Sequence, residues 1–246
     1  MSELVRFEPG DGGLGTIAMV DAKGNNAMTS AWVEAFAEAV RAATAWPELK
    51  VVLLKGTTEV FSSGANVEML ASIVKGTVVP TEIVLPKVVL DIPVPVVAAM
   101  EGHAIGGGLA LGFCADIVVL AKESRYGASF MNMGFTPGMG TTRLLEHALS
   151  PAIVCELLFT GEPKKGSYFD GKAGVNAVLP RAEVLGHATR IAERIADKPR
   201  LSLELLKQTL SLPRRQAFES THTLESLMHR VSFAAPDVLA RIKENI

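Results

Sequence analysis

The sequence is poor in the features that mark several specialised classes of protein. It holds only two cysteines in 246 residues, Cys114 and Cys155, each inside an apolar run, so we expect reduced core thiols rather than a disulfide framework. Its formal net charge of -2 excludes the basic footprint of a nucleic-acid or anionic-membrane binder. No run is apolar and long enough to span a bilayer, and the first residues lack a signal-peptide pattern, which predicts a cytoplasmic protein. No spacing of histidine, cysteine and aspartate suggests a metal site.

What the chain does contain is the balance of an ordinary soluble globular protein, with 48% hydrophobic and 20% charged residues. Its length fits one large domain, or a domain with a helical appendage. Short apolar runs of strand length alternate with helical patterns in the first part of the chain, and from Thr141 onward helical patterns stand alone. This order predicts an α/β core followed by a helical tail.

The N-terminal segment predicts a hairpin and then a helix. Residues 4–8 and 16–20 have strand character, and the loop between them contains a literal G-x-G-x-x-G. A dinucleotide-binding fingerprint needs a helix after its glycines, whereas a strand follows here, so we interpret the loop as a hairpin turn. Thr29 or Ser30 should cap a helix that runs to about Ala45.

The stretch from Ile92 to Asp116, IPVPVVAAMEGHAIGGGLALGFCAD, is the one around which the fold should be organised. Its β-branched apolar run predicts a buried strand, and the apolar residues after the three glycines predict a buried helix. Glycines at such a junction leave bare backbone N–H groups at the positive end of a helix, which suits a carbonyl oxygen that becomes negative during a reaction. A tight strand–helix crossing that requires small residues is the alternative explanation.

Two side chains are further candidates for chemistry. Lys75 is the single cation between residues 65 and 80. His229 follows Glu225 by four residues and stands at the edge of an apolar stripe, where one side of a helix can face a cavity. The stripe consists of Leu224, Leu227, Met228 and Val231. A surface lysine and a solvated or helix-capping histidine are the simpler explanations.

Three segments, FSSGAN, GHAIGGGLALGFCADIVV and YGASFMNMGFTPGMG, together resemble the crotonase (enoyl-CoA hydratase/isomerase) superfamily. The resemblance implies an α/β fold, a spiral of ββα units over residues 1–185. A helical region, 186–246, should cover the active site and contribute to assembly as a homotrimer or hexamer. It also implies two backbone donors that hold a thioester carbonyl and stabilise an enolate, here Ala65 and Gly107.

The departures from the superfamily pattern change the expected reaction. Hydratases carry catalytic glutamates where this chain has Ala110 and Phe130. Adding water across a double bond needs one group to activate the water and one to deliver a proton. Alanine and phenylalanine do neither, so ordinary hydration is not expected, and both residues should shape the substrate pocket.

Within the superfamily, the chain resembles the decarboxylases of polyketide β-branching cassettes. The resemblance rests on Lys75–Gly76, on the turn Met133–Gly140 and on the helix segment Met228–Phe233. It implies a 3-methylglutaconyl substrate on an acyl carrier protein, with no cofactor beyond the phosphopantetheine arm of the carrier. Lys75 would hold the leaving carboxylate, and a protonated His229 would quench the dienolate left after CO2 departs.

The physical chemistry of this reaction agrees with the two replaced glutamates. Loss of CO2 sends electrons through the double bond to the thioester oxygen, which the Ala65 and Gly107 amides should stabilise. A glutamate at position 110 or 130 would repel the substrate carboxylate at short range.

Alternatives remain open on sequence grounds. Another crotonase activity would keep the two backbone donors and use His229 or Glu68 as a base, and a catalytically inert acyl-carrier-binding scaffold is the non-enzymatic alternative. His222 is the fallback acid. His103 should pack against the glycine loop, and Asp116 should have a structural hydrogen-bonding role.

Overall fold

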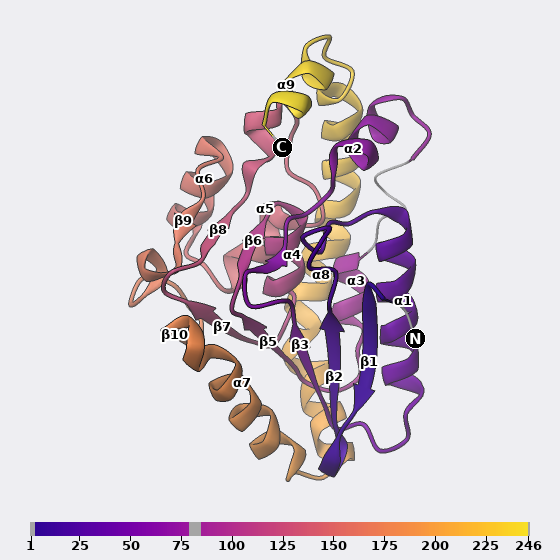
Figure 1. The fold of residues 1–246 in the computed structure, drawn as a ribbon, viewed down its shortest axis with the longest axis vertical. Coiled ribbons are helices and arrows are strands. Elements are labelled where there is room, and N and C mark those ends of the chain that lie inside the picture. The colour runs from indigo at the N-terminus through magenta and orange to yellow at the C-terminus, as the bar shows by residue number, and fades with distance from the viewer. Residues whose placement is uncertain (1–2, 79–84, 246) are drawn as a thin grey trace.

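The computed structural model describes residues 3–78 and 85–245, and the framework of this part of the chain is a six-stranded sheet (Figure 1). Its strands are β1 (Val5–Pro9), β2 (Leu14–Met19), β3 (Val51–Lys55), β5 (Val96–Met100), β7 (Ile117–Ala121) and β10 (Ala177–Leu179). They lie side by side in this same order. β1 and β2 form an antiparallel hairpin, and all the following pairs are parallel.

Successive side chains of a strand point to opposite faces of a sheet, and in the central strands β3, β5 and β7 nearly all of them are buried, so both faces are covered there. One face packs on α7 (Arg181–Ala196), with Val51 and Leu53 of β3 among the residues in contact with that layer. The other face belongs to the main core, together with α1 (Ser30–Ala45) and α3 (Leu85–Leu90). Two-sided burial explains why these strands are nearly continuous apolar runs in the sequence.

A second, smaller sheet completes the spiral. It contains β4 (Val60–Ser62), β6 (His103–Ile105), β8 (Arg125–Gly127) and β9 (Lys164–Lys165), in that order. Each of β3, β5 and β7 is followed directly by a strand of this second sheet, and the chain then returns through helices. The expected α/β spiral of ββα units is therefore confirmed.

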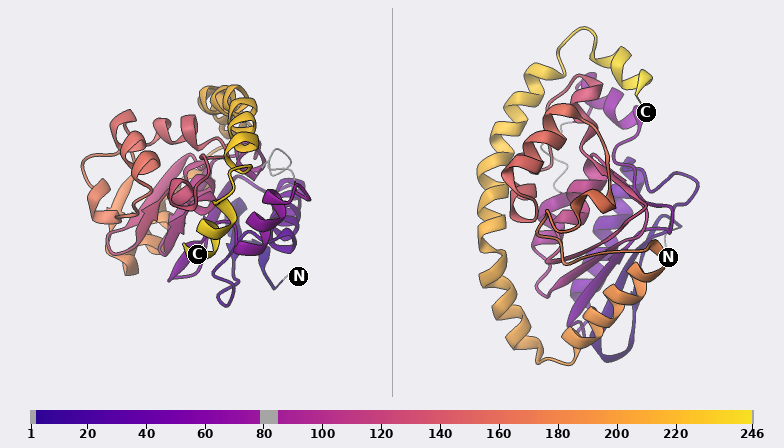
Figure 2. Two further views of the ribbon diagram at one scale, coloured as in Figure 1. Left: turned by 90° about the horizontal axis from the view of Figure 1, so that it is seen from above. Right: turned by 90° about the vertical axis from the view of Figure 1, so that its left-hand side faces the viewer.

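The remaining helical elements lie mostly around the second sheet and at the C-terminus. They are α2 (Val67–Val74), α4 (Gly107–Phe113), α5 (Thr141–Leu144), α6 (Pro151–Thr160), α8 (Arg200–Ser232) and α9 (Val238–Glu244), with short 3-10 helices at Asp11–Gly13, Ser129–Met133, Leu145–His147 and Gly166–Phe169. Figure 2 shows α8 running along one long edge of the molecule, with α9 folding back at its end. α9 contacts α2, so the C-terminal segment returns to the part of the fold that follows the first predicted donor loop.

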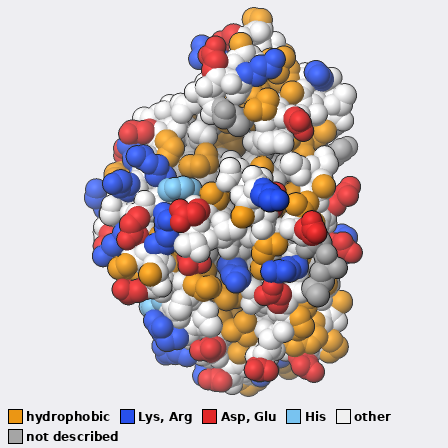
Figure 3. Space-filling model, in the orientation of Figure 1, with side chains coloured by type: hydrophobic (Ala, Val, Ile, Leu, Met, Phe, Trp, Pro, Cys, Tyr) orange, Lys and Arg blue, Asp and Glu red, His pale blue; other side chains and the backbone are white. Residues whose placement is uncertain are grey.

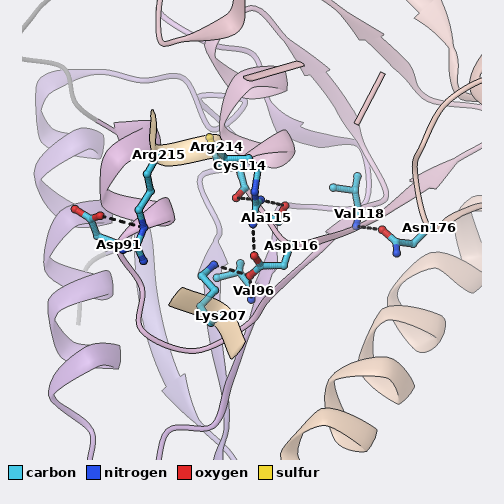
Figure 4. Close-up of polar contacts among 10 residues, drawn as sticks. All are labelled: Asp91, Val96, Cys114, Ala115, Asp116, Val118, Asn176, Lys207, Arg214 and Arg215. Atoms are coloured by element: carbon cyan, nitrogen blue, oxygen red, sulfur yellow. Dashed lines mark hydrogen bonds and ion pairs between the residues drawn. The ribbon is translucent and has the colours of Figure 1, made fainter. Parts of the chain in front are cut away.

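A buried ion cluster ties α8 to the end of α4 (Figure 4). The Asp116 carboxylate accepts a hydrogen bond from Lys207 at 2.6 Å and another from Arg214. Arg214 also donates to the carbonyls of Cys114 at 3.0 Å and Ala115 at 2.7 Å, and so satisfies two acceptors at the C-terminal end of α4. Asp116 thus has a structural hydrogen-bonding role in fixing α8.

Several local predictions hold. The glycine-rich loop connects two antiparallel strands, and the Thr29 side chain caps α1 by accepting the Trp32 N–H at 3.1 Å. The prediction of helices alone after Thr141 is wrong, because β9 and β10 are too short to give a strand pattern yet pair with β8 and β7. The boundary expected at residues 185 and 186 falls inside α7, and the division into two domains stays a prediction.

One burial prediction is also wrong. Cys155 is exposed on α6, whereas Cys114 is buried as expected. The apolar stripe of α8 points away from the fold, with Leu224 62% and Val231 77% exposed. The face that packs inward includes Phe218, Thr221 and Glu225, and Glu225 accepts a hydrogen bond there from the backbone of a turn.

The surface carries both signs of charge. Lysines and arginines are interspersed with aspartates and glutamates over the face seen in Figure 3. In the part of the chain that the structure describes, no helix combines the length and the apolar character that crossing a membrane would require.

Candidate active site

A cavity of about 470 Å³ lies between α2, the start of α4, the 3-10 helix Ser129–Met133 and the last turns of α8. Apolar side chains form most of its wall, among them Met28, Met69, Leu70, Ile73, Ile105, Phe130, Met133, Phe135, Met139 and Phe233. Among the described residues that line it, His229 has the only titratable side chain. The described wall therefore presents no carboxylate to a bound molecule.

The first bare amide is that of Ala65. Gly64, just before it, has a φ of 79°, and its carbonyl accepts the Met28 N–H at 2.8 Å. Because the C=O and N–H of a trans peptide point in opposite directions, the Ala65 N–H points away from the Met28 backbone. A Cβ on Gly64 would lie 2.7 Å from the Ile105 oxygen and 3.1 Å from the Gly107 nitrogen, so glycine is needed where this loop approaches the second donor.

The second bare amide is that of Gly107, the first residue of α4. The Gly106 carbonyl accepts the Ala110 N–H at 3.2 Å inside the helix, so the N–H of the same peptide points out of the N-terminal end. Neither the Ala65 nor the Gly107 N–H has a hydrogen-bond partner among the described residues. Both residues line the cavity, and two preorganised donors of this kind suit an oxygen that becomes negative.

Buried polar groups hold the first loop in place. The Asn26 side-chain nitrogen donates to the carbonyls of Val60 and Phe61, each at 3.1 Å. The Asn26 carbonyl accepts the Ser62 hydroxyl at 2.8 Å, and the same hydroxyl oxygen accepts the Gly64 N–H at 3.2 Å. This chain of contacts joins the start of the loop to the segment that precedes α1.

His229 reaches the cavity from α8. Its Nε2 lies 2.9 Å from the Thr136 carbonyl oxygen, which can only accept, so the proton is on Nε2. The ring meets Phe135 and Phe233 edge-on, with centroids 6.4 and 5.2 Å away. Burial lowers the pKa of His229, and the backbone carbonyls of Thr136 and Pro137 oppose that effect. In the neutral form Nδ1 is a proton acceptor, and in the charged form it becomes a donor.

Four of the six residues predicted for the site meet in this cavity. Ala65, Gly107, Phe130 and His229 all line it, although they come from four separate parts of the chain. Phe130 stacks edge-on against Phe135, with centroids 6.1 Å apart, and so forms part of the same aromatic wall.

The other two predicted residues are not among those that line the cavity. Lys75 follows α2 directly, and its side chain is exposed, two residues beyond Ile73, which does line the cavity. Ala110 is buried one turn into α4, where its amide bonds to Gly106. Binding of the carboxylate by Lys75 therefore stays a prediction, as does the pocket role of Ala110.

The remaining histidines and Glu68 lie outside the cavity. The His103 Nδ1 accepts the Arg125 N–H at 2.8 Å, at the strand edge that leads to the glycines. His222 is packed on Phe218 with ring centroids 5.3 Å apart. Glu68 is exposed in the first turn of α2.

Sequence reasoning missed two methionines beside the second donor. A Cβ on Gly107 would lie 2.8 Å from the Met139 sulfur and 2.9 Å from the Met28 sulfur, so the two thioethers enclose this glycine. Their segments, NNAM and TPGMG, were visible only as a helix start and a turn. Nothing in their spacing places them on either side of a residue far away in the sequence.

Comparison with known proteins gives a consistent set of relatives. The family model described as enoyl-CoA hydratase/isomerase matches residues 10–241. The chain is 41% identical over 197 residues to the bacillaene synthase decarboxylase PksI of Bacillus subtilis, covering 80% of this chain and 79% of that protein. The ECH2 decarboxylase domain of CurF from Lyngbya majuscula superposes with a TM-score of 0.92 at 34% identity, covering all of both chains. A structure from a dehydratase/decarboxylase enzyme couple involved in polyketide β-branching gives a TM-score of 0.94 at 36% identity, with 98% of each chain covered.

Proposed function

The chain belongs to the enoyl-CoA hydratase/isomerase family, and within it we propose a decarboxylase of polyketide β-branching that acts on a 3-methylglutaconyl thioester held by an acyl carrier protein. The relatives named as decarboxylases support the lyase activity, and the couple involved in polyketide β-branching supports the pathway. The observation that carries the proposal is a pair of bare backbone donors facing a cavity whose described wall holds one histidine and no acid.

The proposed reaction uses the donors to accept charge. The bond between the terminal carboxylate and its carbon breaks, and its electron pair moves through the double bond onto the thioester oxygen. CO2 leaves, and the dienolate is stabilised by the N–H groups of Ala65 and Gly107. A proton from charged His229 then forms a new C–H bond at the α or the γ carbon of the dienolate and gives the decarboxylated thioester. These steps use no cofactor other than the phosphopantetheine arm that carries the substrate.

The absence of the two hydratase glutamates favours loss of CO2 over addition of water. Ala110 and Phe130 are both buried and uncharged, so they neither activate water nor repel a substrate carboxylate. Lys75 is proposed to bind that carboxylate, reaching in from the end of α2. Its exposed amine is free to steer a negatively charged substrate toward the mouth of the cavity.

Homo-oligomerisation as a trimer or hexamer is part of the proposal. The exposed stripe of Leu224, Leu227 and Val231 supports it, because contiguous apolar side chains on a helix are normally covered by a partner. The acyl carrier protein is the second proposed partner, since the substrate arrives on it.

The deciding experiment measures CO2 and product mass with 3-methylglutaconyl groups loaded on a carrier protein and, in parallel, on coenzyme A. We expect rapid loss of CO2 from the carrier-bound substrate and negligible hydration of crotonyl-CoA. Hydration at the rate of a true hydratase, without CO2 release, would contradict the proposal.

One observation favours a second candidate, double-bond isomerisation. A lowered pKa keeps His229 neutral near pH 7, and a neutral imidazole is suited to act as a base. Isomerisation of a thioester that lacks a terminal carboxylate, measured in the same assay, distinguishes this activity from decarboxylation.

A further inference from the structure

We propose that Glu225 is a positioning residue for the active site, because it fixes the turn that touches both His229 and Gly107. The turn spans residues 136–142: it follows the 3-10 helix Ser129–Met133 and includes Thr141 and Thr142, the first two residues of α5. The reaction that this turn would serve rests on the proposed function, whereas the contacts described below do not depend on it.

The Glu225 carboxylate accepts three hydrogen bonds from the turn. It is only 3% exposed and accepts the Gly140 N–H at 2.6 Å. Its other oxygen accepts the N–H of Thr142 at 3.0 Å and the hydroxyl of the same residue at 2.7 Å. An ionised carboxylate has only acceptors, and here three donors satisfy it. Glu225 does not line the described cavity, so it acts through the turn and not on a substrate.

The turn reaches both sides of the site. The Thr136 carbonyl accepts from His229, and a Cβ on Gly138 would lie 2.3 Å from the Cε1 of that ring, so ring and turn are in direct contact. The next residue, Met139, carries its sulfur to within 2.8 Å of a Cβ built on Gly107. Consecutive residues of one turn therefore contact the proposed acid and the proposed oxyanion donor.

The conformation of the turn needs an external support. Met139 has a φ of 59°, in the left-handed region that side chains other than glycine rarely adopt. Such a residue persists only where the surrounding contacts over-determine it. Glu225 supplies these contacts immediately after Met139, and His229, one helical turn further along α8, supplies another before it. Two successive turns of α8 thus hold both ends of the strained segment.

The test compares Glu225→Gln with Glu219→Gln, a matched change on the same helix at a side chain that is 67% exposed. The glutamine amide introduced by Glu225→Gln would place an NH2 group against a backbone N–H, which loosens the turn with little change in side-chain volume. The titration is followed in protein labelled with 13C at the histidine Cε1, and the His229 signal is assigned by its absence from His229→Gln. We expect Glu225→Gln to raise the pKa of His229 toward its ordinary value, because water would then reach the ring. Glu219→Gln should leave that titration unchanged.

Kinetics give a second readout. We expect Glu225→Gln to lower kcat by about 10- to 100-fold, the size of effect known for small displacements of catalytic groups, with KM unchanged. Thr142→Val removes one of the three donors and should give a smaller change in the same direction, whereas Thr142→Ser keeps the hydroxyl and should restore the wild-type values.

An unchanged His229 titration and kcat in folded, correctly assembled Glu225→Gln would overturn the proposal. If that variant does not fold, Thr142→Val decides by the same two measurements. A wild-type protein without decarboxylase activity would refute the proposed function, and the His229 titration would still decide whether Glu225 positions the turn.

Discussion

The two sides of the cavity offer a substrate different kinds of group, backbone amides on one side and a side chain on the other. On one side, the groups offered to a substrate are backbone amides, those of Ala65 and Gly107, and glycines allow the loops to approach each other. On the other side, the working group is a side chain, His229, carried by a helix and supported by a turn. Backbone donors are insensitive to most substitutions, whereas the α8 side depends on packing between distant segments.

This difference predicts how each side fails. A substitution impairs the backbone side only if it removes an N–H or forces the loops apart. Its effect should be weaker stabilisation of the negative charge that develops in the reaction. Damage to the α8 side can come from residues that never touch a substrate, because the position of His229 depends on its neighbours.

Gly107→Pro should have the largest effect, since proline lacks the N–H and its ring distorts the start of α4. Loss of one oxyanion donor typically costs about 3–4 kcal/mol of barrier, so decarboxylation should fall below detection once the distortion is added. The measurement is CO2 release by protein whose circular dichroism and assembly match the wild type. Full activity in such protein would remove Gly107 from the mechanism.

The Gly107 half of the backbone side could be predicted from the residues for a physical reason, whereas Ala65 was predicted only through the family resemblance. Glycines at a strand–helix junction report directly on the local backbone, and Gly64 and Gly107 are both positions where a Cβ would collide with a neighbour. The pairing of the two loops was not visible from the residues alone. It depends on Met28, whose amide holds Gly64 from a segment far earlier in the chain.

Lys75→Ala tests a residue that lies on neither side of the cavity. If Lys75 binds the substrate carboxylate, the variant should lose most CO2 release at every pH, because alanine cannot make that ion pair. Lys198→Ala, which changes another exposed lysine two residues after α7, is the matched control. Wild-type turnover by Lys75→Ala would leave the decarboxylase without its proposed carboxylate anchor and would favour an unspecified crotonase activity.

His229→Ala should leave a residual reaction, because the carboxylate can still depart and solvent can protonate the dienolate slowly. We expect product formation to fall by about 10²-fold, the lower end of the range for general acid catalysis, with a changed ratio of double-bond isomers. Product mass and isomer ratio over time measure both effects. If His229→Ala matches the wild type in both measurements, the proton donor is not His229, and His222 or water becomes the better candidate.

The pH dependence of the wild type sharpens the same prediction. Burial lowers the pKa of His229 below 6.5, so the charged, proton-donating form is lost as pH rises through that lowered value. A rate limited by proton delivery should therefore fall with rising pH in this acidic range.

For the free energy of unfolding, the pH dependence of His229 has the opposite sign. The neutral ring stabilises the fold above pH 6.5, and this contribution is lost as pH falls through the lowered pKa.

The α8 side was only partly predictable. The spacing placed His229 at the edge of an apolar stripe and left a solvated or helix-capping histidine as the simpler explanation, whereas in the structure His229 lines the cavity and the stripe is exposed. Periodicity reports which residues share a face and not what covers that face. The inward face carries Glu225 because its partners are backbone N–H groups of a turn, and no sequence pattern marks such acceptor sites.

Asp116→Asn should have the smallest effect on rate and a large one on stability. Lys207, whose side chain is 1% exposed, and Arg214 would lose the negative charge that they share. Removing one member of a buried ion cluster typically costs about 3–5 kcal/mol, so the melting temperature should drop clearly. The cluster holds the part of α8 near Lys207, whereas Glu225 holds the part near His229. At a temperature where the variant is folded, kcat should therefore stay near the wild-type value.

Asp91→Asn, which breaks only ion pairs with partly exposed partners, is the control for loss of one carboxylate. A loss of kcat in Asp116→Asn as large as that in His229→Ala would mean that the two ends of α8 do not act independently.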